Sequence, residues 1–235
     1  MASPIQLAAI QRACDLIAAS EALPSLGQLS AMAGFSRFHF HRLFKSFLGI
    51  TPREYAATCR LVRLQQELAR GTPVLQAIYG AGYGSPSRVY ETTANMLGMT
   101  PSCFRAGARG IAICHVVLWT PFGWLLVALT SRGLCALEFG ESPAELRTQL
   151  SGRFPRASLH EGSAELRALI SRTADVAALH RFCPELPLSI QGVAYQRRLW
   201  RALQRLLFAV PRLPEGRPQE ALSTFPGLQE RGGEP

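Results

Sequence analysis

Five side chains between residues 37 and 45 have the types and spacing needed to bind a nucleic acid. They fall on one face of an expected helix and are Arg37, Phe38, His41, Arg42 and Lys45. Four of them can donate hydrogen bonds to base edges or phosphates, and Phe38 could pack against a thymine methyl group. The opposite face carries a stripe typical of burial, formed by Phe40, Leu43, Phe44 and Phe47. The alternative is an ordinary solvated basic face, which many runs of charge are.

The cysteines give a weaker indication of function than the basic face does. The six are scattered along the chain, at Cys14, Cys59, Cys103, Cys114, Cys135 and Cys183, and no two stand at Cys-x-x-Cys spacing. A zinc knuckle or a redox pair is therefore not indicated. Cys114 precedes His115, but neighbouring residues of a strand point to opposite faces, so the two would not pair. We expect Cys114 and Cys135 to pack in the core as small hydrophobes, and we predict no metal, cofactor or small-molecule ligand.

The basic face belongs to a unit that occurs twice. The segments Ala33-Gly34-Phe35 and Leu48-Gly49-Ile50-Thr51-Pro52 are echoed by Ala81-Gly82-Tyr83 and Leu97-Gly98-Met99-Thr100-Pro101. A short apolar helix precedes each copy, over residues 26–33 and 74–81, and Ser36 can cap the helix that follows the first turn. A helix, a Gly-containing turn and a second helix predict a helix-turn-helix unit, whose second helix lies in the major groove of DNA.

The second copy is less basic than the first. Its candidate contacts are Ser85, Ser87, Arg88 and Tyr90, and the nearby Glu91 would repel a phosphate. We therefore expect the first copy to contribute more of the affinity. A helix over residues 53–69 would join the two copies and, if rigid, would set the separation of the two recognition helices, about 34 Å for one turn of DNA.

Composition agrees with a folded protein that has a polyanionic partner. The chain has 235 residues, of which 48% are apolar and 17% charged, so wholesale disorder is excluded and two domains of ordinary size fit. The net charge is +9 and the isoelectric point is near 9.9, which favours nucleic acid or an anionic surface. Because the N-terminus shows no signal-peptide pattern, we expect a cytoplasmic location.

Residues 111–129 form an uncharged run long enough to suggest a membrane helix. A turn sequence, Thr120-Pro121-Phe122-Gly123, lies in the middle of this run. The flanks are rich in Val, Leu and Trp, and a second turn follows at Ser131-Arg132-Gly133. These signals predict three short antiparallel strands and no membrane span.

The rest of the chain divides by its periodicity. Helices are expected over residues 143–150 and 164–179, a linker at Glu185-Leu186-Pro187 and an amphipathic basic helix over 194–207. Residues 208–235 contain five prolines and no period, which predicts a disordered tail.

The repeated unit resembles the AraC/XylS-type DNA-binding domain over about residues 8–107, including both Gly-Ile-Thr-Pro and Gly-Met-Thr-Pro endings. The resemblance implies an all-α, homeodomain-like double helix-turn-helix domain over residues 1–107 in a transcription regulator that binds double-stranded DNA, with RNA polymerase as a further expected partner. It also implies that the exposed positions of the first recognition helix contact bases.

Residues 110–205 resemble the O6-alkylguanine-DNA alkyltransferase domain of Ada-type proteins, which follows an AraC-type domain. The motifs are Trp119-Thr-Pro-Phe-Gly, Gly133-Leu-Cys-Ala-Leu and the segment Leu188-Ser-Ile-Gln-Gly-Val-Ala-Tyr-Gln. The fold class implied is multidomain, α followed by α/β. It comprises a small ribonuclease-H-like α/β subdomain over 110–183, a truncated helical start of the catalytic subdomain over 187–207, and the tail.

The alkyltransferase reaction needs an activated thiolate, which that family places in a Pro-Cys-His-Arg motif. This sequence contains no such motif. We therefore expect a DNA-binding regulator linked to the alkylation-damage response, with the alkyltransferase chemistry lost and no catalytic residue. The aperiodic tail fits an out-of-frame reading or an early truncation, which resequencing the gene through codon 207 would test. The alternatives are a methylated-DNA–protein-cysteine S-methyltransferase acting in DNA repair through a different cysteine, and a defective product whose second half is unfolded.

Overall fold

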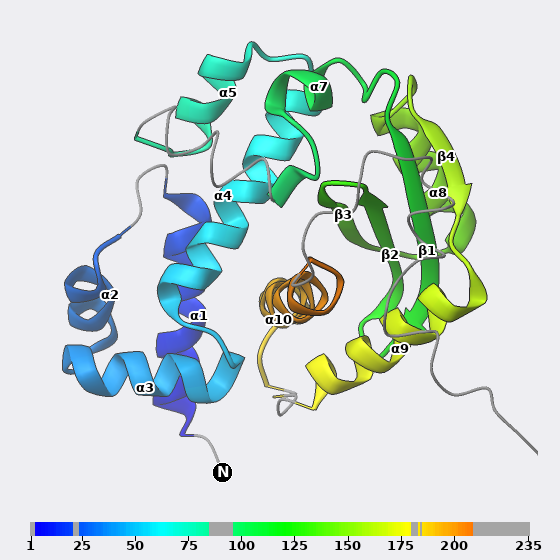
Figure 1. Ribbon diagram of the computed structural model, residues 1–235. Coiled ribbons are helices and arrows are strands. Elements are labelled where there is room, and N and C mark those ends of the chain that lie inside the picture. The colour runs from blue at the N-terminus through cyan, green and yellow to red at the C-terminus, as the bar shows by residue number, and fades with distance from the viewer. Residues whose placement is uncertain (1–2, 21–23, 85–95, 180–182, 184, 209–235) are drawn as a thin grey trace, which may run out of the picture.

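The computed structural model describes residues 3–20, 24–84, 96–179, 183 and 185–208 (Figure 1). The first part of the chain is helical, as expected. Its elements are α1 (Pro4–Ala19), α2 (Leu26–Ala33), α3 (Arg37–Leu48), α4 (Pro52–Ala69), α5 (Val74–Gly80) and α7 (Pro101–Arg105). The predicted contacts Ser85, Ser87, Arg88 and Tyr90 and the tail from residue 209 onward lie outside the described residues.

Local sequence signals determine where the helices of the first unit begin and end. The hydroxyl of Ser36 accepts a hydrogen bond from the His39 amide at the start of α3, which confirms the predicted cap. Thr51 and Glu54 form a capping box at the start of α4. Between α2 and α3 the chain turns at Gly34, whose φ of 73° is a left-handed conformation that glycine adopts without strain.

The uncharged run forms strands, as predicted. β1 (Ala112–Thr120), β2 (Gly123–Thr130) and β3 (Gly133–Gly140) are antiparallel neighbours, and β4 (Ser158–Glu161) pairs in parallel with β1, giving the order β3-β2-β1-β4. Helices α8 (Pro143–Arg153) and α9 (Ala164–Ala178) pack against this sheet. No helix in the described part of the chain is both long and apolar enough to span a membrane.

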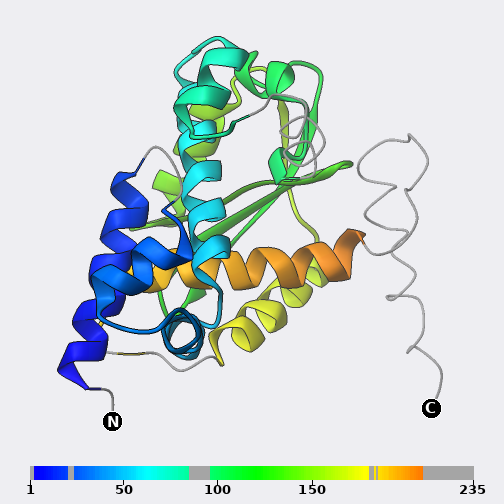
Figure 2. The ribbon, with the colours of Figure 1, turned by 90° about the vertical axis from the view of Figure 1, so that its left-hand side faces the viewer.

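The last helix, α10 (Leu188–Phe208), begins six residues before the predicted start at residue 194. Leu186, for which the sequence predicts a linker, is only 3% exposed. The physical reason is packing: Leu186, Ile190 and Ala194 join the buried cluster formed by α1 and α3. In Figure 1 α10 is seen end-on between α4 and the sheet, and Figure 2 shows it crossing the molecule beside α4.

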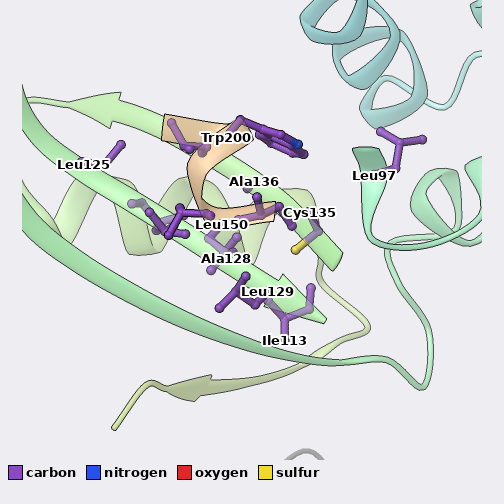
Figure 3. Packing of buried hydrophobic residues seen from close by; sticks show 14 of the residues in the cluster. Leu97, Ile113, Leu125, Ala128, Leu129, Cys135, Ala136, Leu150 and Trp200 are labelled. Carbon is purple, nitrogen blue, oxygen red and sulfur yellow. The ribbon is translucent and has the colours of Figure 1, made fainter. Parts of the chain in front are cut away.

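Two hydrophobic clusters hold the molecule together, and α10 contributes to both. The first contains α1, α2, α3, the start of α4 and the N-terminal part of α10. The second joins the end of α4, α5 and α7 to the sheet, α8, α9 and the C-terminal part of α10. In Figure 3, Trp200 of α10 lies over the sheet near Ala136 and extends toward Leu97, which comes from the second repeat.

Side-chain amides from two helices cover the edge strand β3. Gln65 of α4 donates to the carbonyl oxygen of Cys135 at 3.4 Å, and Gln196 of α10 donates to that of Leu137. An edge strand presents unpaired backbone groups, so these contacts satisfy acceptors that would otherwise need water or another chain. The two hydrogen bonds also connect α4 and α10 to the same strand.

Candidate nucleic-acid interface

The predicted contact face of the first unit is open to solvent on α3. Arg37, Phe38, Arg42 and Lys45 are exposed, Phe38 by 73%, and His41 is half-buried. Phe40, Leu43 and Phe44 are buried on the other side, as predicted, and Phe47 is half-buried. The structure therefore brings all five predicted residues of this unit onto one helix, and four of them are exposed to solvent.

The positive charges of this face have no acidic partner among the described residues. Among the residues that the structure describes, no carboxylate makes an ion pair with Arg37, Arg42 or Lys45. The guanidinium of Arg42 lies over the Phe38 ring, 5.6 Å from its centroid. A cation–π contact of this kind is worth about 0.5–1 kcal/mol at an exposed site and therefore favours this arrangement of the two side chains.

Arg37 packs differently from Arg42. Its guanidinium covers Gly27 of α2, so a Cβ placed on that glycine would lie 3.1 Å from Arg37 Nη2. A side chain at residue 27 would displace the Arg37 guanidinium by a few tenths of an ångström. Arg37 is thus positioned at the junction of the two helices of the unit.

The second unit is described up to residue 84 and from residue 96. Its turn is held by Arg60 of α4, whose guanidinium lies over the Tyr83 ring at 5.3 Å and donates to the Gly82 carbonyl oxygen at 3.4 Å. Burial raises the pKa of Tyr83, outweighing the opposing effect of Arg60. The joining helix α4 has 18 residues and is about 27 Å long at 1.5 Å per residue.

Burial has the largest effect on the pKa of all six thiols. Burial raises the pKa of every cysteine, that of Cys135 to about 12. Cys114 and Cys135 are 5% and 0% exposed, which confirms their place in the core. His115 is also buried, and its pKa is lowered by that burial. Within the described residues, no group of three His, Cys, Asp or Glu side chains is placed to hold a metal ion.

Two arginines of α10 contact the first unit, which the sequence pattern did not indicate. Arg198 donates to the Leu48 carbonyl oxygen at 2.6 Å, and Arg201 forms an ion pair with Glu54, also at 2.6 Å. Contacts across 150 and 147 residues leave no local pattern in the sequence. The only available signal was the position of both residues outside the apolar stripe of a basic helix.

Comparison with known proteins agrees with this architecture. The family described as "Helix-turn-helix domain" matches residues 29–107. The chain is 34% identical over 206 residues to "Regulatory protein ada" of Salmonella typhimurium, covering 85% of this chain and 58% of that protein. It is 34% identical over 197 residues to "Bifunctional transcriptional activator/DNA repair enzyme Ada" of Escherichia coli, covering 84% and 55%.

A third relative matches the helical part alone. It is "Probable transcriptional regulator LumQ" of Photobacterium leiognathi, 33% identical over 82 residues, which are 34% of this chain and 33% of that protein. The chain spans a little more than half the length of the two Ada proteins. The helix-turn-helix match and the similarity along both halves identify it as an Ada-like protein with an AraC-type helix-turn-helix domain.

Proposed function

We propose that this protein is a sequence-specific DNA-binding transcription regulator of the AraC/Ada type. The observation that carries the proposal is the exposed basic face of α3, on the second helix of a helix-turn-helix unit. In such units this helix enters the major groove, where guanidinium and imidazole groups read base edges. The regulators among the similar proteins, including one named as a transcriptional activator, support the same assignment.

The residues of the α3 face divide into two roles. Arg42 is exposed and His41 is half-buried near the middle of the helix, and both are proposed to contact bases together with the exposed Phe38. Arg37 and Lys45, toward the ends, are proposed to bind phosphates. Ser85, Ser87, Arg88 and Tyr90 are proposed as the corresponding contacts of the second unit.

The two parts of the chain are proposed to correspond to residues 1–107 and 110–207. A mixed four-stranded sheet with α8 and α9 packed on it supports a ribonuclease-H-like subdomain over 110–183. Residues 187–207, which form most of α10, are proposed to correspond to the first helix of an alkyltransferase catalytic subdomain. RNA polymerase is proposed as a partner, and the similarity to Ada proteins supports a role in the response to alkylation damage.

Alkyl transfer from damaged DNA is the second candidate function. The Escherichia coli relative is named as a DNA repair enzyme, which favours it. The raised pKa of each cysteine argues against it, because a thiol attacks an alkyl carbon as the thiolate. Incubation with DNA carrying radiolabelled O6-methylguanine separates the two functions, since only a transferase acquires label. We propose that no label is transferred.

The test of the first function is binding-site selection from random duplex DNA with the full chain, followed by titration on the selected site. A regulator of this kind selects one consensus and binds it about 10³-fold or more tightly than unrelated DNA. Its affinity falls steeply with salt because phosphate contacts release counterions. Recovery of no consensus would contradict sequence-specific binding.

A further inference from the structure

Helix α10 is attached to the recognition helix by Arg198. Its Nη1 donates to the carbonyl oxygen of Leu48, the last residue of α3, at 2.6 Å, while its Nε donates to the Ala177 carbonyl oxygen of α9 at 3.0 Å. The last carbonyls of a helix have no partner within that helix and carry its negative dipole end, so a guanidinium there is favourable. One side chain therefore joins the C-terminal end of α3 to α9.

Arg201, one turn further along α10, makes the second attachment. Its Nη1 is 2.6 Å from Glu54 Oε1, and the other carboxylate oxygen of Glu54 accepts from the amide and hydroxyl of Thr51, the cap of α4. Burial alone would raise the pKa of Glu54, but the hydrogen bonds from Thr51 and the charge of Arg201 outweigh it and lower that pKa. Glu54 is thus ionised near neutral pH and pairs with Arg201 at the start of α4.

These two arginines meet the chain at the turn between α3 and α4. The turn runs through Gly49, Ile50 and Thr51, and it determines the angle between the recognition helix and the helix that leads to the second unit. Ile190 and Ala194, on the preceding turns of α10, are buried in the core of the first unit. The first unit is therefore held by α10 from its core to the end of α3.

The same helix is fixed to the body that carries the second unit. Gln196 donates to the Leu137 carbonyl oxygen of β3, and Trp200 is buried in the cluster that contains Leu97 and Met99. The second unit approaches this body closely, since Thr130 Oγ1 donates to the Gly98 carbonyl oxygen at 2.5 Å. Thus α10 connects α3 to the second unit by a route other than α4.

We propose that Arg198 and Arg201 are positioning residues for DNA recognition, which fix the orientation of α3 relative to the second helix-turn-helix unit and so set the half-site spacing that the protein accepts. The inference rests on the proposed function. Neither residue needs to touch DNA. With the attachment intact, α4 and α10 both hold the first unit; without it, α10 keeps its apolar contacts but loses its polar ones to α3 and α4.

The experiment measures spacing preference with the full chain. Duplexes carry the selected site, the same site with one base pair inserted between its two halves, and the first half alone. An insertion shifts one half by about 3.4 Å and rotates it by about 34–36° about the DNA axis. The wild type should bind the inserted site about tenfold or more weakly, the range expected when contacts to one half are lost.

We define the spacing penalty as the affinity for the selected site divided by the affinity for the inserted site. Arg198→Gln and Arg201→Gln should each reduce this spacing penalty by about threefold or more. Their affinity for the first half alone should stay within about twofold of the wild-type value, which is the usual scatter of such measurements. Arg205→Gln is the matched control. It removes the same charge from the same helix, and Arg205 is exposed with no ion pair among the residues that the structure describes. It should leave the penalty unchanged.

Conservative replacements separate positioning from stability. Arg201→Lys keeps a charge that can pair with Glu54 and should restore the spacing penalty. Arg198→Lys should not, because one ammonium group lacks the fork that reaches both Leu48 and Ala177. The spacing penalty is a ratio of two affinities of one variant, so a partly unfolded fraction cancels from it. If Arg198→Gln does not fold, Arg201→Gln is the variant to use, because the Arg201 side chain is 39% exposed.

The outcomes distinguish this proposal from the function on which it rests. Wild-type protein that selects no site overturns both. Wild-type protein that binds its site, with spacing penalties equal in the wild type and in both glutamine variants, overturns the positioning role and leaves DNA binding intact. A reduced penalty in Arg205→Gln as well would show a general charge effect and would also overturn it.

Discussion

The backbone at Gly98 approaches the carbonyl oxygen of Gly133 so closely that a Cβ on Gly98 would lie 2.7 Å from that oxygen. Gly98 belongs to the second sequence repeat, and Gly133 begins β3. The φ of Gly98 is 62°, which is a left-handed conformation. Residue 98 therefore favours glycine for two reasons, because a side chain would have no room and because the backbone is left-handed. It lies where the helical part of the chain meets the sheet.

Replacing Gly98 by alanine should destabilise the protein more than the same change at Gly71. Both glycines have positive φ, which costs alanine about 1–2 kcal/mol. At Gly71 a Cβ would meet no atom within 4 Å, whereas at Gly98 it would meet backbone, which adds about 1–3 kcal/mol of overpacking. Denaturant unfolding of the two variants measures the difference. Equal losses would show that the contact between the second unit and β3 is looser than described.

Ile190→Ala should destabilise the first unit, although residue 190 lies far from it in sequence. Ile190 is 4% exposed and packs with α1 and α3, so truncation should cost about 2–5 kcal/mol. Leu188→Ala on the same helix is the control. Leu188 is 65% exposed, and its truncation should cost less than about 0.5 kcal/mol.

Two measurements check this expectation. Thermal unfolding gives the loss of stability, and hydrogen exchange of the native protein gives the protection of the amides in α1 and α3. Loss of protection in both helices on Ile190→Ala is the expected result. Protection that stays at the wild-type level would mean that α10 does not contribute to that core.

The thiols should react slowly and in an order set by burial. All six cysteines have raised pKa values, so alkylation by iodoacetamide at pH 7.5 should be slower than for a free thiol. Cys103 and Cys183, which are half-buried, should be modified before Cys14 and Cys135. Peptide mass spectrometry after timed quenching gives the order. A single cysteine that reacts faster than a free thiol would reveal an activated nucleophile and revive the transferase function.

Local sequence signals predicted much of the first unit. The boundaries of α2 at Leu26–Ala33 and the Ser36 cap of α3 followed from patterns within a few residues. The strands were predicted because the turn at Thr120-Pro121-Phe122-Gly123 interrupts an otherwise continuous apolar run. The basic face of α3 could be predicted because burial of its apolar stripe determines which side remains in water.

Other features depend on tertiary contacts that leave no local pattern. The sequence predicts too late a start for α10, because Leu186 and Ile190 are buried by α1 and α3 whereas the residues near Pro187 are typical of a linker. The parallel strand β4 is only four residues long and mostly exposed, so no alternation identifies it. The roles of Arg198 and Arg201 depend on Leu48 and Glu54, whose proximity only the fold creates.

The central claim is that the exposed face of α3 reads DNA, and one comparison tests it most directly. The affinity of wild type, Arg42→Ala and Arg172→Ala for the selected site is measured at one salt concentration and again on unrelated DNA. Arg172 is exposed on α9, so its replacement removes the same charge away from the proposed interface. Arg42→Ala should lose about 1–3 kcal/mol of specific affinity, with a smaller effect on unrelated DNA. Equal affinities of Arg42→Ala and Arg172→Ala for the selected site would contradict base reading by α3.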